Sequence, residues 1–353
     1  MLLNETFDRF KTLPMALALA LAFALAITPQ ASRAQSVATP VSADAWRGIV
    51  AAARKEGRVM LYTSHADPIT KRMKEDFGKL YPDIALETAR YTGGVTISRV
   101  EQERTTGSDG ADVTISADTG YFTVKLAEGL IKAPVGPSME TFPQRHLIRG
   151  AIPIVQLEVM VMAYNTRLAK TPVAGYRDLL RPELKAKIGL SDLGAIPILA
   201  WYDWLEKAYG QDFVAQLARQ QPRFYAGAVP TGPATGSGEI EVSGFANLGS
   251  SLPLIEQGAP IKIVVPRPAF AYTNGMSILG WSKRPNAAQV FTDYLTSVRG
   301  QTMLVGRGEA ASVRPGIPGA LEAPDLEFFD PTPYNADTVK ARTDRWKLVF
   351  KGN

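Results

Sequence analysis

The chain has no cysteine among its 353 residues and only two histidines, His65 and His146. The absence of cysteine excludes disulfide bonds, thiolate catalysis, cysteine-ligated metal sites and a lipid-anchored cysteine at a cleaved N-terminus. Two histidines leave little material for a Ser-His-Asp triad or a histidine-rich zinc site. The fold must therefore depend on its apolar core, and a hydrophobic content of 46% is sufficient for one in a chain of this length.

Several signatures of other protein classes are also missing. The sequence contains no Gly-x-Ser-x-Gly elbow, no His-Glu-x-x-His pair and no Gly-rich loop ending in Gly-Lys-Ser/Thr. No dense Lys/Arg run accompanies the net charge of +5, whereas a nucleic-acid-binding protein usually clusters its basic residues. The sequence thus indicates neither an enzyme nor a nucleic-acid binder and gives no sign of a cofactor. The mild positive charge weakly favours an anionic ligand.

The start of the chain carries a 13-residue apolar run at residues 15–27, preceded by Arg9 and Lys11. Ser32 and Ala34 follow in the spacing of a signal-peptidase site. A membrane-spanning helix needs roughly 20 residues, so this run is too short for a permanent anchor. Residues 1–34 are therefore predicted to be a cleaved secretory signal peptide, and the mature protein is expected in the periplasm of a Gram-negative bacterium.

The remaining sequence repeats an order of strand, loop and helix. Short apolar strands are predicted at residues 58–62, 84–88 and 112–116, each followed by a loop and a helix, and the order returns from residue 187 onward. This pattern predicts an α/β fold with mostly parallel sheets flanked by helices. Two long apolar strands, at residues 158–164 and 261–266, are expected to be the crossings between two lobes.

The order of several motifs resembles a known family, the extracellular solute-binding proteins of ABC importers, in the class that contains ferric-iron, phosphonate and thiamine binders. The segments that carry the resemblance are residues 59–64 (VMLYTS), 110–113 (GADV) with Asp118 beyond it, 163–166 (AYNT), 178–192 (DLL to SD) and 286–301 (NAA to GQ). Each motif is weak alone, but together they span about 250 residues in the family's order.

The resemblance implies the two-lobed type II fold of periplasmic binding proteins, in which a solute is held between the lobes. It places residues 45–157 and 268–353 in the first lobe and residues 158–267 in the second. The partners that it implies are a small-molecule solute and an inner-membrane permease with its ATPase, and a monomer is expected. A ligand sensor for a membrane signalling receptor would use the same closure, and the sequence does not separate the two roles.

Ligands of open α/β sheets bind beyond the carboxyl ends of the strands, near helix N-termini. The residues in such loops are the candidate ligand contacts: Ser64, His65, Thr92, Gly93, Asp118, Asp192, Thr231, Asn247 and Tyr272. Each has a structural alternative. Ser64 and Thr231 could be helix caps, Thr92 and Gly93 a turn, and Asp118 and Asp192 helix caps or hinge braces. Trp201 and Trp204 are expected in the core.

The ligand itself is predicted to be a small organic anion such as a carboxylate or phosphonate, because the candidate loops are rich in Ser, Thr, Gly and Asn and the chain is basic. Ferric iron is the alternative, since ferric binders of this class often have a histidine where His65 lies. They typically also have adjacent tyrosines, and no two tyrosines are adjacent here. A cationic ligand stays open, because Asp118, Asp192 and Tyr202 could receive it.

Overall fold

The computed structural model describes residues 41–322, 327–329, 331 and 333–351. The signal peptide predicted at residues 1–34 lies outside these ranges. The described chain forms two β-sheets with helices on both faces of each.

The first sheet has the strand order β2-β1-β3-β12-β6-β5, with β4 and β13 paired to β12. Its strands are β1 (Arg58–Thr63), β2 (Ala85–Arg90), β3 (Val113–Ser116), β4 (Ile131–Lys132), β5 (Leu147–Ile148), β6 (Ile152–Val159), β12 (Phe270–Leu279) and β13 (Glu327–Phe328). The helices of this lobe are α1 (Ala43–Glu56), α2 (Asp67–Leu80), α3 (Gly93–Thr106), α4 (Thr119–Ala127), α5 (Pro137–Glu140), α10 (Pro285–Thr296) and α11 (Val298–Val305), with a 3-10 turn at Gln144–His146.

The alternation of side chains along β1 explains why helices cover both faces of this sheet. Val59 and Leu61 point to one face, where they pack with α1, α2, α10 and α11. Met60 and Tyr62 point to the other, where they join a smaller cluster with α3 and α4. A strand that is apolar at every position is suited to burial on both sides.

The second sheet has the order β11-β7-β10-β8-β9. Its strands are β7 (Val161–Asn165), β8 (Ile188–Ser191), β9 (Arg223–Tyr225), β10 (Val242–Ala246) and β11 (Ile261–Val264). Its helices are α6 (Ile196–Tyr209), α7 (Phe213–Arg219), α8 (Thr231–Ser237) and α9 (Leu248–Glu256), with 3-10 turns at Tyr176–Leu180 and Pro182–Leu184. Trp201 and Trp204 are buried in the core of this lobe, as expected.

The prediction of mostly parallel sheets was wrong. In the first sheet, β12 runs antiparallel to both β3 and β6, and in the second β7 runs antiparallel to both β10 and β11. The physical reason is the way in which the chain crosses between lobes. It leaves the first sheet at the end of β6, enters the second in β7, and returns after β11 into β12, so the crossing strands lie against the direction of their neighbours. The strand at residues 261–264 belongs to the second sheet, and the return follows it.

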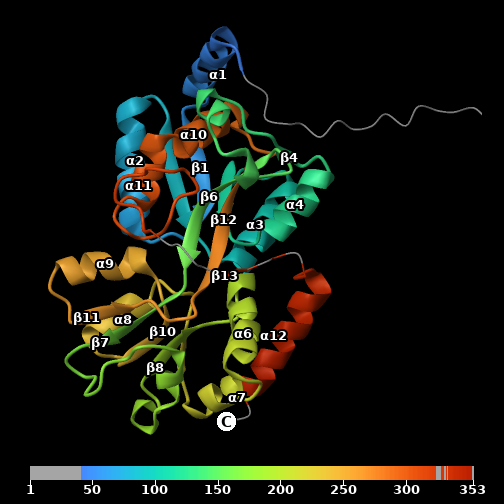
Figure 1. Cartoon of the computed structure of the whole chain (residues 1–353). Helices are drawn as coiled ribbons and strands as arrows, with labels where there is room; N and C mark the ends of the chain where they lie inside the picture. The colour runs from blue at the N-terminus through green and yellow to red at the C-terminus, as the bar shows by residue number, and fades with distance from the viewer. Residues whose placement is uncertain (1–40, 323–326, 330, 332, 352–353) are drawn as a thin grey trace, which may run out of the picture. The chain divides into compact units, whose positions relative to one another are not determined.

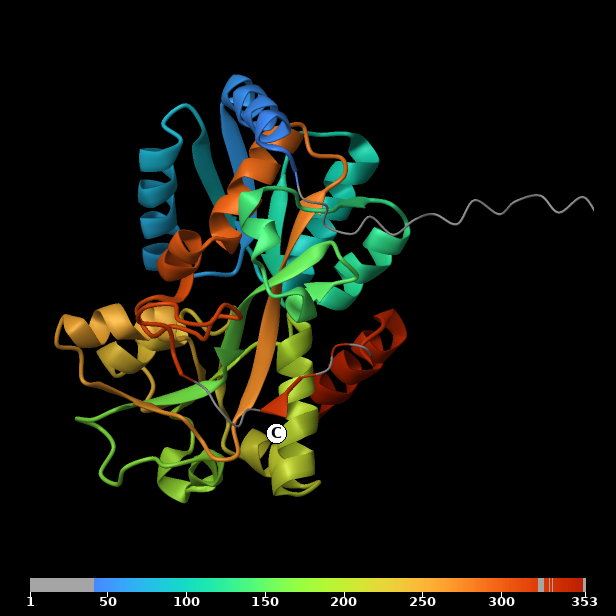
Figure 2. The same cartoon turned by 45° about the horizontal axis from the view of Figure 1, so that its top comes forward.

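The C-terminal helix α12 (Ala336–Lys351) corrects the expected extent of the first lobe, which was to include residues up to 353. This helix packs against α6 and α7 of the second lobe, and both views show it beside α6 (Figures 1 and 2). Trp346 is fully buried there, stacked near Tyr202. Arg345 also pairs with Glu206 at 2.6 Å. Apolar burial therefore places α12 with the second lobe.

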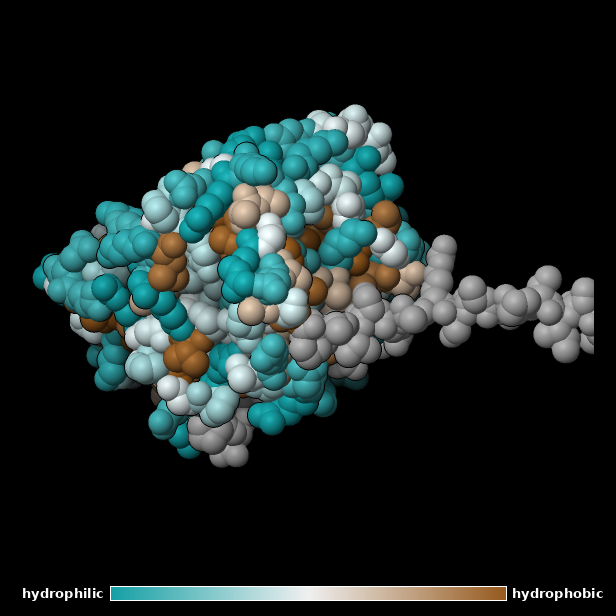
Figure 3. Space-filling view, turned by 90° about the horizontal axis from the view of Figure 1, so that it is seen from above, coloured by the Kyte–Doolittle hydropathy of each residue, from teal (hydrophilic) through white to brown (hydrophobic). Residues whose placement is uncertain are grey.

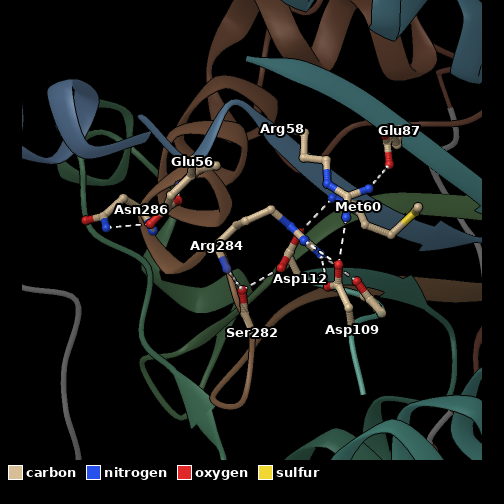
Figure 4. Close-up of polar contacts among 12 residues, drawn as sticks. Glu56, Arg58, Met60, Glu87, Asp109, Asp112, Ser282, Arg284 and Asn286 are labelled. Atoms are coloured by element: carbon tan, nitrogen blue, oxygen red, sulfur yellow. Dashed lines mark hydrogen bonds and ion pairs between the residues drawn. The ribbon is translucent and has the colours of Figure 1, made fainter. Parts of the chain in front are cut away.

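A buried ion pair between Arg284 and Asp112 lies at the end of the first sheet where β1 and β3 begin and β12 finishes (Figure 4). The Nε of Arg284 donates to Asp112 at 2.7 Å, and its other nitrogens donate to Asp109. Asp112 also accepts the backbone N–H of Met60 and the hydroxyl of Ser282. Because these donors come from β1 and from the loop after β12, one carboxylate fixes the relative positions of β1, β3 and β12.

We expect the substitution Asp112→Ala to be strongly destabilising, because it removes the buried carboxylate that accepts from the Nε of Arg284, the hydroxyl of Ser282 and the N–H of Met60, and only Asp109 then remains to pair with Arg284. Loss of one member of a buried pair typically costs about 3–5 kcal/mol. Urea unfolding of the two proteins measures the difference. Asp44→Ala is the matched control, since Asp44 forms an ion pair with Arg47 in which both side chains are mostly exposed. An equal decrease in the free energy of unfolding in the two variants would contradict this role of Asp112.

Candidate functional site

A cavity of about 80 Å³ lies where strands of the first sheet meet the helix N-termini of the second lobe. A single water needs about 10–15 Å³ on this measure, so the cavity can hold part of a small organic molecule. Its lining includes Ser64 and His65 after β1, Arg90 at the end of β2, and Asp118 after β3. The cavity thus lies beyond the carboxyl ends of parallel strands.

Seven of the nine candidate residues line this cavity: Ser64, His65, Thr92, Gly93, Asp118, Asn247 and Tyr272. The other two do not. Thr231 is fully buried, and its hydroxyl donates to the carbonyl groups of Ala228 and Phe245, so it holds the start of α8. The side chain of Asp192 accepts the N–H of Gly194 and holds a turn. Thr231 is the first residue of α8 and not its N-cap, and Asp192 caps no helix, so each has a local structural role that differs from the expected alternative.

Four helices begin at the cavity, and their N-cap residues line it. These residues are Thr92 for α3, Asp118 for α4, Ala195 for α6 and Asn247 for α9. A helix N-terminus carries a partial positive charge, so this convergence favours negative charge in the cavity.

A continuous set of hydrogen bonds runs along one wall, which we call the polar chain: Thr63, His65, Gln156, Asn274, Glu158 and Asn247. The Nδ2 of Asn274 donates to Gln156 and Glu158 at 3.2 Å each. Asn247 donates to Glu158 at 3.0 Å while its Oδ1 accepts the N–H of Ser250 as the cap of α9. The polar chain therefore joins strands of the first sheet to a helix of the second lobe.

The position of His65 in the polar chain fixes its protonation. The Oε1 of Gln156 can only accept, so the Nε2 of His65 must carry the hydrogen, and its Nδ1 then accepts from the hydroxyl of Thr63. Burial lowers the pKa of His65, outweighing the opposing effects of Glu158 and Gln156. His65 is a neutral imidazole with both nitrogens occupied, so it offers no lone pair to a metal ion in this arrangement.

Two direct contacts join the lobes beside the cavity. The N–H of Gly94 donates to the carbonyl of Gly194 at 3.1 Å. The N–H of Ile196 donates to Asp118 at 3.3 Å. Asp118 therefore does not cap its own helix α4 but accepts from the first residue of α6.

Arg90 also lines the cavity, and the sequence analysis missed it. Its side chain is exposed, and no carboxylate within the described ranges pairs with it. A cation at the end of a strand, just before a Thr-Gly-Gly helix start, was the signal available in the sequence.

Sequence reasoning also missed Gln156 and Glu158 in β6. These residues stand opposite Asn274 and Tyr272 of β12 in the antiparallel register. Polar residues at alternate positions of an otherwise apolar strand share one face, and this period of two was the signal that could have found them.

A second, larger pocket of about 1000 Å³ shares Asp118 and Ala195 with the cavity. Its other lining comes mainly from α4, α12 and the start of α6, and it is largely apolar. None of the residues of the polar chain lines it, so the smaller cavity is the better candidate for a polar ligand.

The surface adds little to the site. The face in Figure 3 is mostly hydrophilic, with hydrophobic residues scattered over it. Among the helices within the described ranges, none has both the length and the apolar composition that crossing a membrane requires.

Comparison with known proteins gives a family and a fold. Residues 40–308 match the model of the bacterial extracellular solute-binding protein family. The structure is similar to the substrate-binding protein of an ABC transporter from Agrobacterium tumefaciens, with a TM-score of 0.75 and 15% identity over 85% of this chain and 97% of that one.

Two further structures with bound ligands are also similar. AfuA from Actinobacillus pleuropneumoniae, with fructose-6-phosphate bound, has a TM-score of 0.63 and 22% identity over 84% of this chain and 97% of its own. Iron-bound HitA from Pseudomonas aeruginosa has a TM-score of 0.64 and 17% identity over 83% and 99%. These likenesses show the two-lobed fold of periplasmic binding proteins, as predicted, and at such identities they show the fold alone.

The protonation of His65 can be tested by nuclear magnetic resonance. We expect the imidazole of His65 to be the neutral tautomer with hydrogen on Nε2 and to titrate below its ordinary pKa of 6.5, because burial disfavours the charged form. A pH titration of the ring signals measures this, and His146→Gln assigns the remaining signals to His65. A pKa of His65 above the ordinary value of 6.5 would contradict the hydrogen-bond directions of the polar chain.

Proposed function

The chain belongs to the bacterial extracellular solute-binding protein family, and on this basis we propose that it is the periplasmic substrate-binding component of an ABC importer. It captures a small organic anion between its lobes and delivers it to an inner-membrane permease, whose ATPase is a separate chain. The protein acts as a receptor and not as a catalyst, and it works as a monomer.

The observation that carries this proposal is the cavity where the lobes meet. Both lobes contribute polar groups to it: Ser64 and Arg90 from the first, Asn247 from the second. A ligand in contact with both lobes stabilises the arrangement in which they are close, and so shifts a hinge equilibrium towards closure. The permease would recognise this closed form.

An anionic ligand is favoured by Arg90 and by the helix starts. Arg90 lines the cavity as a cation without a carboxylate partner in the described part of the chain. The four N-caps add the positive ends of their helices. AfuA supports a ligand of this class, since it has a phosphorylated sugar bound.

Ferric iron has one supporting comparison, iron-bound HitA. The residues of the cavity support it less. Both nitrogens of His65 are occupied within the polar chain. Tyr272 is partly buried beside Glu158, and desolvation and that carboxylate raise the pKa of its phenol well above the usual value. Iron binding through phenolate oxygen would require the opposite shift. A search of the described residues finds no group of three His, Asp or Glu side chains that could hold a metal ion.

The role of a sensor for a membrane receptor would use the same cavity and the same closure. Transport is favoured because the chain's fold is shared with the substrate-binding protein of an ABC transporter. Loss of solute uptake on deletion of the gene distinguishes transport from signalling.

The role of Arg90 is tested by the substitution Arg90→Gln. We expect it to weaken binding of an organic anion about 10- to 100-fold, because a charge-assisted hydrogen bond contributes about 1.5–3 kcal/mol. The probe is fructose 6-phosphate first, then the phosphonate or carboxylate that gives the largest thermal shift. A ligand at about 100 times its Kd adds roughly 2.7 kcal/mol of stability.

Lys79→Gln is the control for this experiment, because Lys79 is exposed near the end of α2 and does not line the cavity. A protein that binds none of the organic anions, or an Arg90→Gln variant that binds them as well as the wild type, would contradict the proposed ligand class.

The ferric alternative is tested by colour. We expect no visible phenolate-to-iron charge-transfer band when the purified protein is mixed with ferric citrate and then desalted. Visible absorption spectroscopy detects such a band directly. A band that disappears in Tyr272→Phe would establish iron as the ligand and overturn the preference for an organic anion.

A further inference from the structure

We propose that Asp118 determines ligand specificity: the solute must present a hydrogen-bond donor, a hydroxyl or an amine, to the free oxygen of the Asp118 carboxylate. This inference rests on the proposed function and narrows its ligand class. The solute is an organic anion that also carries a hydroxyl or amino group.

The two oxygens of Asp118 have different surroundings. The residue is 1% exposed, and its Oδ1 accepts the N–H of Ile196 at 3.3 Å. Its Oδ2 lies over the α-carbon of Gly93, so close that an added Cβ at this glycine would overlap it. Both residues line the cavity. The absence of a side chain at position 93 therefore leaves room for the second oxygen beside a residue that lines the cavity.

The first turn of α6 offers no second backbone N–H to Asp118. Its second residue is Pro197, which has no N–H, and the next two amides donate to the carbonyl of Ala195. Ile196 is thus the one amide of this turn directed at Asp118. Across the described ranges it is the only hydrogen-bond donor to this carboxylate, which has room for about four.

A buried carboxylate with one long hydrogen bond is costly unless further donors reach it. Burial raises the pKa of Asp118 to about 6, and the hydrogen bond from Ile196 opposes this only in part. The pKa is raised because the charged form is poorly solvated here, so a proton or a ligand donor stabilises the site. Below this pKa the proton supplies the donor, and above it the ligand must.

Within the described ranges no cation replaces that donor: Lys125 and Arg149 line the second pocket, which Asp118 also borders, but neither affects the pKa of Asp118. The first turns of α3 and α6 contain only uncharged residues. The other titratable or charged groups at the cavity are His65, Arg90, Glu158, Tyr91 and Tyr272. Of these, Tyr272 is affected by the charge of Asp118, which helps to raise its pKa.

The same carboxylate orients the ligand. An anionic group would be repelled by ionised Asp118, whereas Arg90 attracts it. The geometry therefore directs the anionic end of the solute to Arg90 and its hydroxyl or amino group to Asp118. An anion of equal charge that lacks such a group leaves Oδ2 without a donor and binds less well.

Matched pairs of probes test this inference: glycerol 3-phosphate against propyl phosphate, and lactate against propionate. Within each pair the anionic group is kept and the hydroxyl groups are lost. Calorimetric titration of the mature wild-type protein at about pH 7.5 should show that, in at least one pair, the hydroxylated member binds about 100-fold more tightly. Sites built to bond a hydroxyl reject the analogue without it by such factors or more.

The variant Asp118→Asn provides the second arm. Asparagine can still accept the N–H of Ile196 through Oδ1, but it presents an N–H donor to the cavity. A ligand hydroxyl can accept this N–H, but the bond is no longer assisted by the charge of a carboxylate, so the preference for the hydroxylated probe should narrow clearly. Asp67→Asn is the matched control, because Asp67 is exposed in the first turn of α2 and outside the cavity lining. Its preference should equal that of the wild type.

A pH series on the wild type needs no variant to fold. The ratio of the two dissociation constants in a pair should narrow from about pH 7.5 to about pH 5, since protonated Asp118 is neutral and its burial no longer requires a donor from the ligand. Equal binding of both members at all pH values, or an unchanged preference in a folded Asp118→Asn protein, would overturn the inference and leave the proposed function intact. Binding of no member of either pair would count against both.

Discussion

The buried pair of Arg284 and Asp112 is the constraint on which the first lobe depends. Asp112 is fully buried at the start of β3, and it accepts hydrogen bonds from β1 and from the loop that follows β12. A charge in such a place is tolerated only with its partner and additional donors. Because β1 and β3 run away from this edge and β12 runs towards it, the opposite ends of all three strands meet at the cavity. The position of His65, Asp118 and Asn274 relative to one another is thus set by a contact at the far end of the same strands.

The cavity combines groups whose hydrogen bonds are complete with groups whose bonds are not. Along the polar chain, His65, Asn274 and Asn247 are each engaged by neighbours within the protein. These residues form a rigid wall, and changing one of them disturbs the others. Arg90 and the Oδ2 of Asp118 are different, since the described residues leave one without a counter-charge and the other without a donor. Ligand recognition is expected at such groups, because a ligand gains most binding free energy from polar groups that have no hydrogen-bond or ion-pair partner within the protein.

Much of the fold and of the cavity follows from the sequence. The α/β order and the helix starts were predictable because apolar strands, Gly-rich loops and helical spacing are local features. Seven of the nine candidate residues lie together for the same reason, since parallel strands bring their carboxyl ends to one edge. The antiparallel crossings were not predictable, because they depend on which strands become neighbours. For that reason Glu158 was read as part of an apolar strand, although its partner Tyr272 lies more than a hundred residues away. Asp192 and Thr231 lie outside the cavity lining, which was not predictable because the hydrogen-bond partners of a loop residue cannot be read from spacing.

The family match ends at residue 308, whereas α12 comes later in the chain and packs along α6. The helix α6 begins with Ile196, the donor to Asp118, and its N-cap Ala195 lines the cavity. A segment beyond the residues that the family model matches therefore supports the helix α6, whose N-terminal end lies at the cavity. The direction of the Ile196 N–H thus depends on packing against a helix more than a hundred residues further along the chain.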